Sequence, residues 1–413
     1  MAETSRPPVF SCALLVGGAA VGAGILGLPV QVGLAGFTPF LVGLLVLGLA
    51  MLATALVLAR AQIRHSERCD DLACVFHQDL GHGGKWLATA GYLLNFYGIL
   101  VAYLAGAAAV LSALLGLPEA QPWLLLGFFV VATGLTLFGL AWVRRGNAVV
   151  MAVLGASLVY LLVRAGQNLD TSRLAHAEWA LLPSCLPLIM CSLSFHNIIP
   201  AVVRELGLKP READRALTLG LVIPVLLGAL WTLAVLGALP LTAPEGQPSL
   251  LAAFHADQPA TVPLAQALDS PDLTIAGLVF SVAAIFTSYL AAGTGLMGYW
   301  RDLAPALRPE RRRLWRAMVT FLPPLAVVYL WPDLFLTALN VAGGLGVAVV
   351  FGICPALILW RTSAATGFRA GRVAGLALLA AFLVLAGLEV AQEAGWLSIS
   401  SQVENWTNYQ PRP

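Results

Sequence analysis

Two apolar stretches of this chain carry residues that interrupt a helix and free its peptide groups for binding. Residues 16–29 read VGGAAVGAGILGLP, with five glycines and one proline. Residues 192–200 read SLSFHNIIP, in which serine, histidine and asparagine precede a proline. Glycine weakens a helix and proline removes a backbone donor. We therefore expect helix breaks near Gly22–Gly27 and near Ser194–Asn197.

The free ends of two broken helices suit a zwitterion. A half-helix N-terminus carries partial positive charge and meets a carboxylate, while a C-terminus meets an ammonium group or a cation. Close packing through small residues is the alternative. It accounts for Gly17, Gly18 and Gly22, but not for a second, polar break later in the chain. The pattern therefore favours an amino acid as ligand.

Polar side chains on other predicted helices are further candidates. Asn95 and Tyr103 are eight residues apart and share a helix face, although core packing also explains the tyrosine. Thr287 and Ser288 either hydrogen-bond to their own helix or face a cation together with carbonyls of the first broken helix. Asn340 precedes two glycines and is predicted at a gate.

His196 is the only ionisable side chain predicted at mid-depth, which favours proton coupling. The alternatives are a neutral histidine bonded to a freed carbonyl, and Na⁺ bound near Thr287 and Ser288. Glu389 and Glu393 lie near a predicted helix end, where we expect them to reach water. No cofactor is expected other than the transported H⁺ or Na⁺.

Composition places these segments in lipid. Hydrophobic residues make up 59% and charged residues 11% of the 413 positions, with a mean hydropathy of +0.85. Soluble domains carry about 25% charged residues, so this chain cannot cover a water-facing surface. The net charge of +2 gives no reason to expect nucleic acid, and no obligate protein partner is evident. The expected partners are the bilayer and a small molecule.

A membrane-spanning helix needs about 20 mostly apolar residues, and the sequence contains eleven such runs. They are Val9–Val32, Phe37–Ala61, Trp86–Leu115, Trp123–Val143, Ala148–Val163, Leu181–Val203, Ala216–Leu239, Leu273–Trp300, Leu314–Leu330, Leu334–Trp360 and Val373–Ala394. With the N-terminus inside, 20 of the 23 Lys and Arg residues fall in inner segments, as the positive-inside rule requires. The C-terminus is then outside.

Interrupted helices at matching places in two halves indicate a transporter with inverted repeats. Spans 1–5 and 6–10 each hold an odd number of helices, so the halves must be inverted relative to each other. The expected units are a first repeat (1–165), a second repeat (166–362), helix 11 (363–397) and a disordered tail (398–413). The fold class is all-α, with broken helices 1 and 6.

Other function classes find little support. The sequence has no P-loop, no HExxH and no nucleophile elbow, so an intramembrane enzyme lacks its machinery. A channel is disfavoured because broken helices in both halves suit alternating access. The six cysteines form no CxxC pair or metal-ligand cluster, and we interpret them as small buried hydrophobes. No metal site is predicted.

Four motifs resemble the bacterial hydroxy/aromatic amino acid permeases, the tyrosine-, tryptophan- and serine-type permeases of the amino acid–polyamine–organocation superfamily. They are GAGILGLP in span 1, SFHNIIP in span 6, TSYLAAGTGL in span 8 and GICPALILW in span 10. The resemblance covers nearly the whole chain. One departure is Gly298, where the family often has an acidic residue.

The resemblance implies a leucine-transporter-type fold and amino acid symport across the bacterial inner membrane. An aromatic substrate is expected, with serine, threonine or another neutral amino acid as the alternative. The implied substrate residues are Gly22, Ala23, Gly24, Ile25 and Gly27 in span 1, and Ser194, Phe195, His196 and Asn197 in span 6. Pro29 and Pro200 join Asn340 as expected gating residues.

Overall fold

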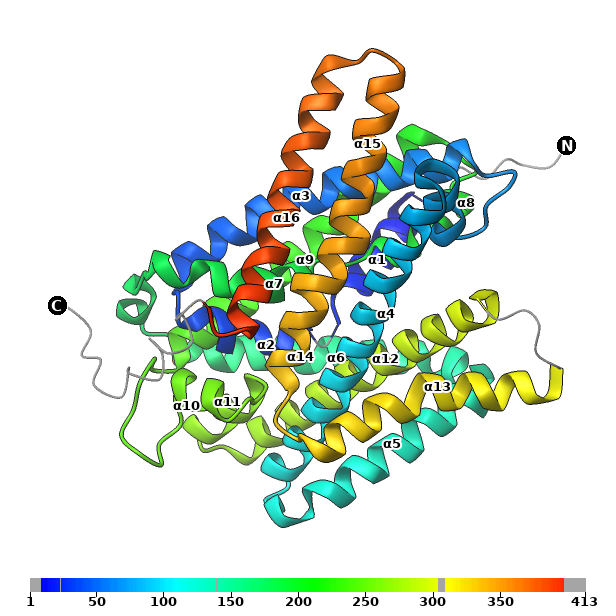
Figure 1. Ribbon diagram of the computed structural model, residues 1–413. Helices are drawn as coiled ribbons and strands as arrows, with labels where there is room; N and C mark the ends of the chain where they lie inside the picture. The colour runs from blue at the N-terminus through cyan, green and yellow to red at the C-terminus, as the bar shows by residue number, and fades with distance from the viewer. Residues whose placement is uncertain (1–8, 23, 139, 304–308, 397–413) are drawn as a thin grey trace, which may run out of the picture.

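The computed structural model describes residues 9–22, 24–138, 140–303 and 309–396, and these residues form helices and connecting loops without a β-strand (Figure 1). The elements of the first part are α1 (Val9–Ala20), α2 (Gly24–Gly33), α3 (Phe37–Arg64), α4 (Leu72–Leu114), η1 (Pro118–Ala120), α5 (Gln121–Phe138) and α6 (Leu140–Gln167).

The second part continues the same architecture. Its elements are η2 (Thr171–Ala175), η3 (Trp179–Leu181), α7 (Leu182–Ser192), η4 (His196–Ile198), α8 (Ile199–Glu205), α9 (Pro210–Ala238), α10 (Leu250–His255), α11 (Thr261–Ala267), α12 (Pro271–Leu303), α13 (Pro309–Leu330), α14 (Phe335–Val341), the π-helical η5 (Ala342–Ile353), α15 (Cys354–Ala365) and α16 (Arg369–Glu393).

The chain has several helices suited to a membrane. Within the described ranges, nine are long and apolar enough to cross one, and the bent pair α1–α2 raises this number to ten. The predicted run Leu314–Leu330 lies in α13, whose first turns are rich in arginine and which contains Pro323 and Pro324. It is not among the nine, so the count of eleven stays a prediction. The predicted tail, 398–413, lies outside the described residues.

The first break lies slightly earlier than predicted. Helix α1 ends at Ala20, α2 begins at Gly24, and their axes differ by 57°. The stretch Gly24–Gly27 is therefore helical and opens α2. Pro29 lies inside α2, where it removes one backbone hydrogen bond. The first N–H groups of α2 already lack partners within the helix. The predicted interruption is present, and it lies between the end of α1 at Ala20 and the start of α2 at Gly24.

The second break matches the predicted segment. Helix α7 ends at Ser192, a 3₁₀ turn covers His196–Ile198, and α8 begins at Ile199. Pro200 is the second residue of α8, where its missing N–H group is not needed. The sixth predicted span is thus two half-helices joined by a non-helical connection at residues 193–195.

Helix α4 runs through the middle of the molecule (Figure 1). It contacts η5 and α14 on one side and α12, α5 and α13 on the other. A Cβ atom at Gly346 of η5 would lie 2.5 Å from the backbone nitrogen of Asn95, so only glycine permits this approach. Beyond η5, α15 and α16 (orange and red in Figure 1) lie side by side.

The outer faces of the bundle are apolar. Leu49 of α3, Val130 of α5 and Val384 of α16 are more than half exposed. Exposed apolar side chains on several helices suit a surface that contacts lipid or protein. Because every peptide group of a helix is paired internally, such helices can face hydrocarbon without cost.

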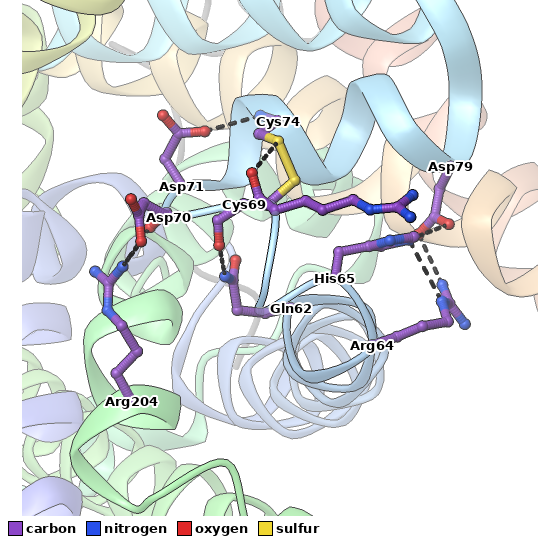
Figure 2. The surroundings of a disulfide bond; sticks show 10 residues. Gln62, Arg64, His65, Cys69, Asp70, Asp71, Cys74, Asp79 and Arg204 are labelled. Atoms are coloured by element: carbon purple, nitrogen blue, oxygen red, sulfur yellow. Dashed lines mark hydrogen bonds and ion pairs between the residues drawn. A yellow bond between two sulfur atoms is a disulfide. The ribbon is translucent and has the colours of Figure 1, made fainter.

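The cysteine interpretation is wrong for two of the six residues. Cys69 and Cys74 form a disulfide across the loop between α3 and α4, and Figure 2 shows its surroundings. Asp71 caps α4 by accepting a hydrogen bond from the Cys74 N–H at 2.8 Å. Asp70 accepts one from Arg204 at 3.1 Å. The disulfide therefore closes a short loop whose acidic residues contact both α4 and the end of α8.

We expect Cys69→Ser to leave the protein folded but less stable. A disulfide that closes so short a loop contributes about 2 kcal/mol by restricting the unfolded chain. In non-reduced wild-type protein, denaturation and maleimide labelling should modify Cys12, Cys185, Cys191 and Cys354, and all six cysteines after reduction. Cys12→Ser serves as the control and should keep the blocked pair. Six labelled thiols without reductant would contradict the bond.

Candidate functional site

A cavity of about 470 Å³ lies between the two helix breaks. This volume is in the range of small-molecule sites. Its lining comes from both broken spans and from α4, α6 and α12. The described residues that line it are Gly18, Ala19, Ala20, Val21, Gly22, Gly24, Tyr92, Asn95, Phe96, Ile99, Tyr103, Met151, Leu154, Cys191, Ser192, Ser194, Phe195, Asn197, Ile198, Thr287, Ser288, Ala291, Ala292, Thr294 and Gly295.

Most of the predicted site residues meet in this cavity. Those that line it are Gly22, Gly24, Asn95, Tyr103, Ser194, Phe195, Asn197, Thr287 and Ser288. Three of the predicted substrate and ion residues do not line it: Ile25 is buried in the core, Gly27 packs against Leu188 and Leu336, and His196 lies behind the cavity wall. The predicted gating residues Pro29, Pro200 and Asn340 are not in the lining either. Ala23 lies outside the described residues.

Small residues at the first break give the cavity its room. A Cβ atom at Gly22 would lie 3.1 Å from the Ser288 hydroxyl and 3.6 Å from the Tyr103 hydroxyl. A Cβ atom at Gly24 would lie 3.5 Å from the Cα atom of Ser192. The first break therefore contacts α4, α12 and the end of α7, and a methyl group at Gly24 would be in ordinary contact with Ser192.

One face of α4 supplies the aromatic part of the wall. Tyr92, Asn95, Phe96, Ile99 and Tyr103 all line the cavity, and their spacing of three, four, seven and eleven residues from Tyr92 is that of one helical face. The sequence prediction included only Asn95 and Tyr103. Phe96 and Ile99 lie on the same face between these two residues, and extending the face by one turn reaches Tyr92.

His196 is enclosed by aromatic rings and fully buried. Its imidazole stacks on Phe195 and on Phe351 of η5, with ring centroids 4.9 and 4.8 Å away. Its Nε2 atom lies 3.0 Å from the Thr54 hydroxyl, which itself donates to the Met51 carbonyl. Nε2–H is therefore the donor in this pair. No described residue pairs with Nδ1.

Thr287 and Ser288 reach the cavity from α12. The Thr287 hydroxyl donates to the Ala283 carbonyl at 2.9 Å, within its own helix. This leaves the hydroxyl lone pairs free to accept. Ser288 lies beside Gly22, as the close approach above requires. The Ser288 hydroxyl thus lies at the break in the first span, and Thr287 lines the same cavity.

The cavity contains hydrogen-bonding groups but no charge. None of its described lining residues is Asp, Glu, Lys, Arg or His. A ligand with a net charge would lose its hydration without meeting an opposite charge, which is costly. The polar groups offered are hydroxyls, the Asn95 and Asn197 amides, and the peptide groups at the breaks. A ligand with zero net charge suits this lining.

A second pocket of about 240 Å³ continues from the cavity. Tyr92, Asn197 and Gly295 line both spaces. The second pocket also carries charged residues, among them Asp70 and Arg204 at the disulfide loop. Since the loop between α3 and α4 is predicted to be inside, this pocket leads toward the predicted inner side.

Hydrogen bonds close the opposite side of the cavity. The Asn340 amide donates to Gln31 Oε1 at 3.3 Å, and the Gln31 amide donates to the Ser184 carbonyl at 3.1 Å. These bonds join α14, α2 and α7. Asn340 was predicted at a gate, and here it belongs to a polar link between three segments on the predicted outer side.

The loop segments α10 and α11 cover the same side. The Ala260 N–H donates to the Leu26 carbonyl at 2.9 Å, so this cover is attached to α2. Asp257, between α10 and α11, accepts hydrogen bonds from the N–H groups of Phe335 and Leu336 at the start of α14. Burial raises the pKa of the Asp257 carboxyl to about 6. The segment that contains α10 and α11 thus contacts α2 and α14, two of the three helices joined by the Asn340–Gln31–Ser184 bonds.

Comparison with known proteins places the whole chain in one group. The family model described as the tryptophan/tyrosine permease family matches residues 5–392. "Tyrosine-specific transport system 2" of Haemophilus influenzae is 27% identical over 91% of this chain and 93% of its own length. "Tryptophan-specific transport protein" of Shigella flexneri is 25% identical, with 93% and 94% covered.

A solved structure shows the same type of fold. The crystal structure of MhsT in complex with L-phenylalanine superposes with a TM-score of 0.63 and 16% identity. The match covers 94% of this chain and 97% of that chain. At this identity the likeness concerns the fold alone.

The cavity predicts an order of thiol reactivity. Cys191 lines the cavity and is partly exposed, whereas the other free cysteines, Cys12, Cys185 and Cys354, are buried. We expect a small water-soluble methanethiosulfonate reagent to modify Cys191 first, because access limits reaction. Peptide mass spectrometry would measure the order, with Cys191→Ser as the control. Earlier modification of Cys185 would place the water-filled space elsewhere.

Proposed function

The chain belongs to the tryptophan/tyrosine permease family, and from this premise we propose that it takes up an aromatic amino acid by cation symport with alternating access. The observation that carries the proposal is the uncharged cavity between two helix breaks. Ends of half-helices offer partial positive charge to a carboxylate and carbonyls to an ammonium group. Both groups of a zwitterion then find partners without a charged side chain.

An aromatic side chain fits the remaining wall. Tyr92, Phe96 and Phe195 line the cavity, and aromatic rings attract one another in offset or edge-to-face contacts. The relatives described as tyrosine- and tryptophan-specific support the same substrate class. Serine, threonine or another neutral amino acid is the alternative, since Ser194 and Thr287 also face the cavity.

We propose that the protein lies in the bacterial inner membrane with an inverted 5+5 arrangement and an added helix, α16. The charge distribution along the sequence supports the N-terminus inside and the C-terminus outside. In this orientation the second pocket leads to the cytoplasm, and the link through Asn340 and Gln31 lies on the periplasmic side.

The coupling ion that we propose is a proton. His196 contacts α3 through Thr54 and η5 through Phe351. A proton at Nδ1 would put a charge between two aromatic rings and alter the packing of the second break. Na⁺ is the alternative, because Thr287 and Ser288 line the cavity and carry hydroxyl oxygens of the kind that a hard cation binds.

Gly24→Leu should abolish uptake while leaving folded protein in the membrane. Its longer side chain would enter the space beside Ser192, where a Cβ atom is already in contact. Gly24→Ala is the matched control and should keep uptake, because its single methyl group fits at 3.5 Å. Uptake of radiolabelled L-tyrosine and L-tryptophan into proteoliposomes measures both. Normal uptake by the leucine variant would place the substrate elsewhere.

Proton coupling and sodium coupling predict opposite results in the same proteoliposomes. Proton coupling predicts concentrative uptake driven by an inward pH gradient in sodium-free buffer, with a flatter pH response in His196→Ala. Sodium coupling predicts no uptake without sodium and a lost sodium dependence in Thr287→Val. Uptake that requires sodium and ignores the pH gradient would overturn the proton proposal.

A further inference from the structure

Helix α16 carries a carboxyl group whose burial the sequence did not indicate. Glu389, expected near a helix end and in contact with water, is 1% exposed. Neither of its carboxyl oxygens has a hydrogen-bond partner among the described residues. Glu393, one turn further along, is exposed. The expectation for Glu389 is therefore wrong, because α16 turns this face toward the bundle.

No positive charge compensates Glu389 from the elements packed against it, which are η5, α7 and α15. Segment η5 has no titratable side chain, and α7 has only Cys185 and Cys191. Helix α15 has Cys354 and Arg361, and Arg361 donates to the Asp79 carbonyl at the other end of that helix. A buried carboxylate without a partner is strongly disfavoured, so the neutral acid is the form that suits this arrangement.

Glu389 lies directly on the π-helical part of the tenth span. A Cβ atom at Gly344 would lie 2.6 Å from its Cγ atom and 2.8 Å from its carboxyl carbon. Any side chain at position 344 would displace the glutamate. Isolated π-helical turns occur often at functional sites. The carboxyl group is therefore packed against a segment that also contacts His196, through Phe351.

Gly344, which packs against Glu389, lies one turn from Asn340 on the predicted outer side of the cavity. Asn340 is four residues before Gly344 and so lies on the same helix face. Its amide nitrogen donates to Gln31, while its Oδ1 atom is buried without a partner. Movement of the tenth span that broke the Asn340–Gln31 bond would also shift Gly344 away from Glu389. Burial of the carboxyl and the Asn340–Gln31 bond thus involve neighbouring positions of the same span.

We propose that Glu389 is a proton-binding site that favours the closed outer side when it is protonated and the open outer side when it is ionised. The proposal rests on the proton coupling proposed above. The step is the binding of one proton to the carboxylate, and no other bond forms or breaks. Since proton affinity differs between the closed and the open arrangement, proton binding must by linkage change the balance between them.

The test compares Glu389→Gln, Glu389→Asp and the control Glu393→Gln in proteoliposomes of the full chain. Two rates are measured with radiolabelled L-tyrosine and L-tryptophan: accumulation driven by an inward pH gradient without sodium, and counterflow at equal pH. Glutamine keeps the shape of the side chain and cannot ionise. We expect Glu389→Gln to lose about tenfold in driven accumulation, with counterflow close to wild type. Glu393→Gln should match wild type in both.

The results distinguish proton binding at Glu389 from a purely structural role of this residue. Wild-type accumulation with an unchanged pH profile in Glu389→Gln overturns the proposal, while proton coupling itself stands. If Glu389→Gln fails to insert or loses both rates equally, Glu389→Asp decides. Driven accumulation with a shifted pH profile in that variant supports proton binding, and equal loss of both rates makes the residue structural. Absence of pH-driven accumulation in wild type refutes proton coupling and this proposal together.

Discussion

A peptide group without a hydrogen-bond partner in hydrocarbon costs several kcal/mol, and this cost governs where the chain can interrupt its helices. Both interruptions, one between Ala20 and Gly24 and one at residues 193–195, border the same cavity. Part of the peptide groups at the breaks stay paired with backbone carbonyls, namely the N–H groups of Val21, Gly22, Leu193 and Ser194. Val21, Gly22 and Ser194 also line the uncharged cavity, so the breaks border a polar space and not lipid. The remaining helices hold these two connections opposite each other.

Glycine allows the tenth span to pack closely on three sides. Gly343 approaches the Pro187 carbonyl of α7, Gly344 approaches Glu389 of α16, and Gly346 approaches the backbone of Asn95 in α4. In each case a Cβ atom would be closer than 3 Å to a neighbour. A segment with such contacts on every side cannot shift without changing the cavity wall, the outer side and α16 together. This arrangement gives the added helix a physical connection to the cavity.

The two sides of the cavity are held by different kinds of interaction. On the predicted inner side, the Asp70–Arg204 pair is largely exposed, and such pairs contribute little. On the predicted outer side, the bonds of Gln31 with Asn340 and Ser184 join buried or half-buried groups. Hydrogen bonds in such surroundings are costly to break without replacement.

The sequence alone determined the membrane class, the two broken spans and nine residues of the cavity lining, because these follow from composition, from glycine and proline, and from helical periodicity. Glycines and the motif around Phe195 sufficed to indicate the site, and the face of Asn95 and Tyr103 pointed into it. What only the tertiary structure decided depends on neighbours distant in the chain. His196 lies behind the wall because Phe351 and Thr54 enclose it.

The pairing of Cys69 with Cys74 and the burial of Glu389 were likewise not predictable from the sequence. Cys69 and Cys74 pair because the turn after α3 brings their Cα atoms within 5.3 Å, a distance that no spacing rule supplies. Glu389 is buried because η5 presents a glycine to it, although its place near a helix end predicted contact with water. Local pattern determines which helices form and break, whereas burial and pairing depend on which helices become neighbours.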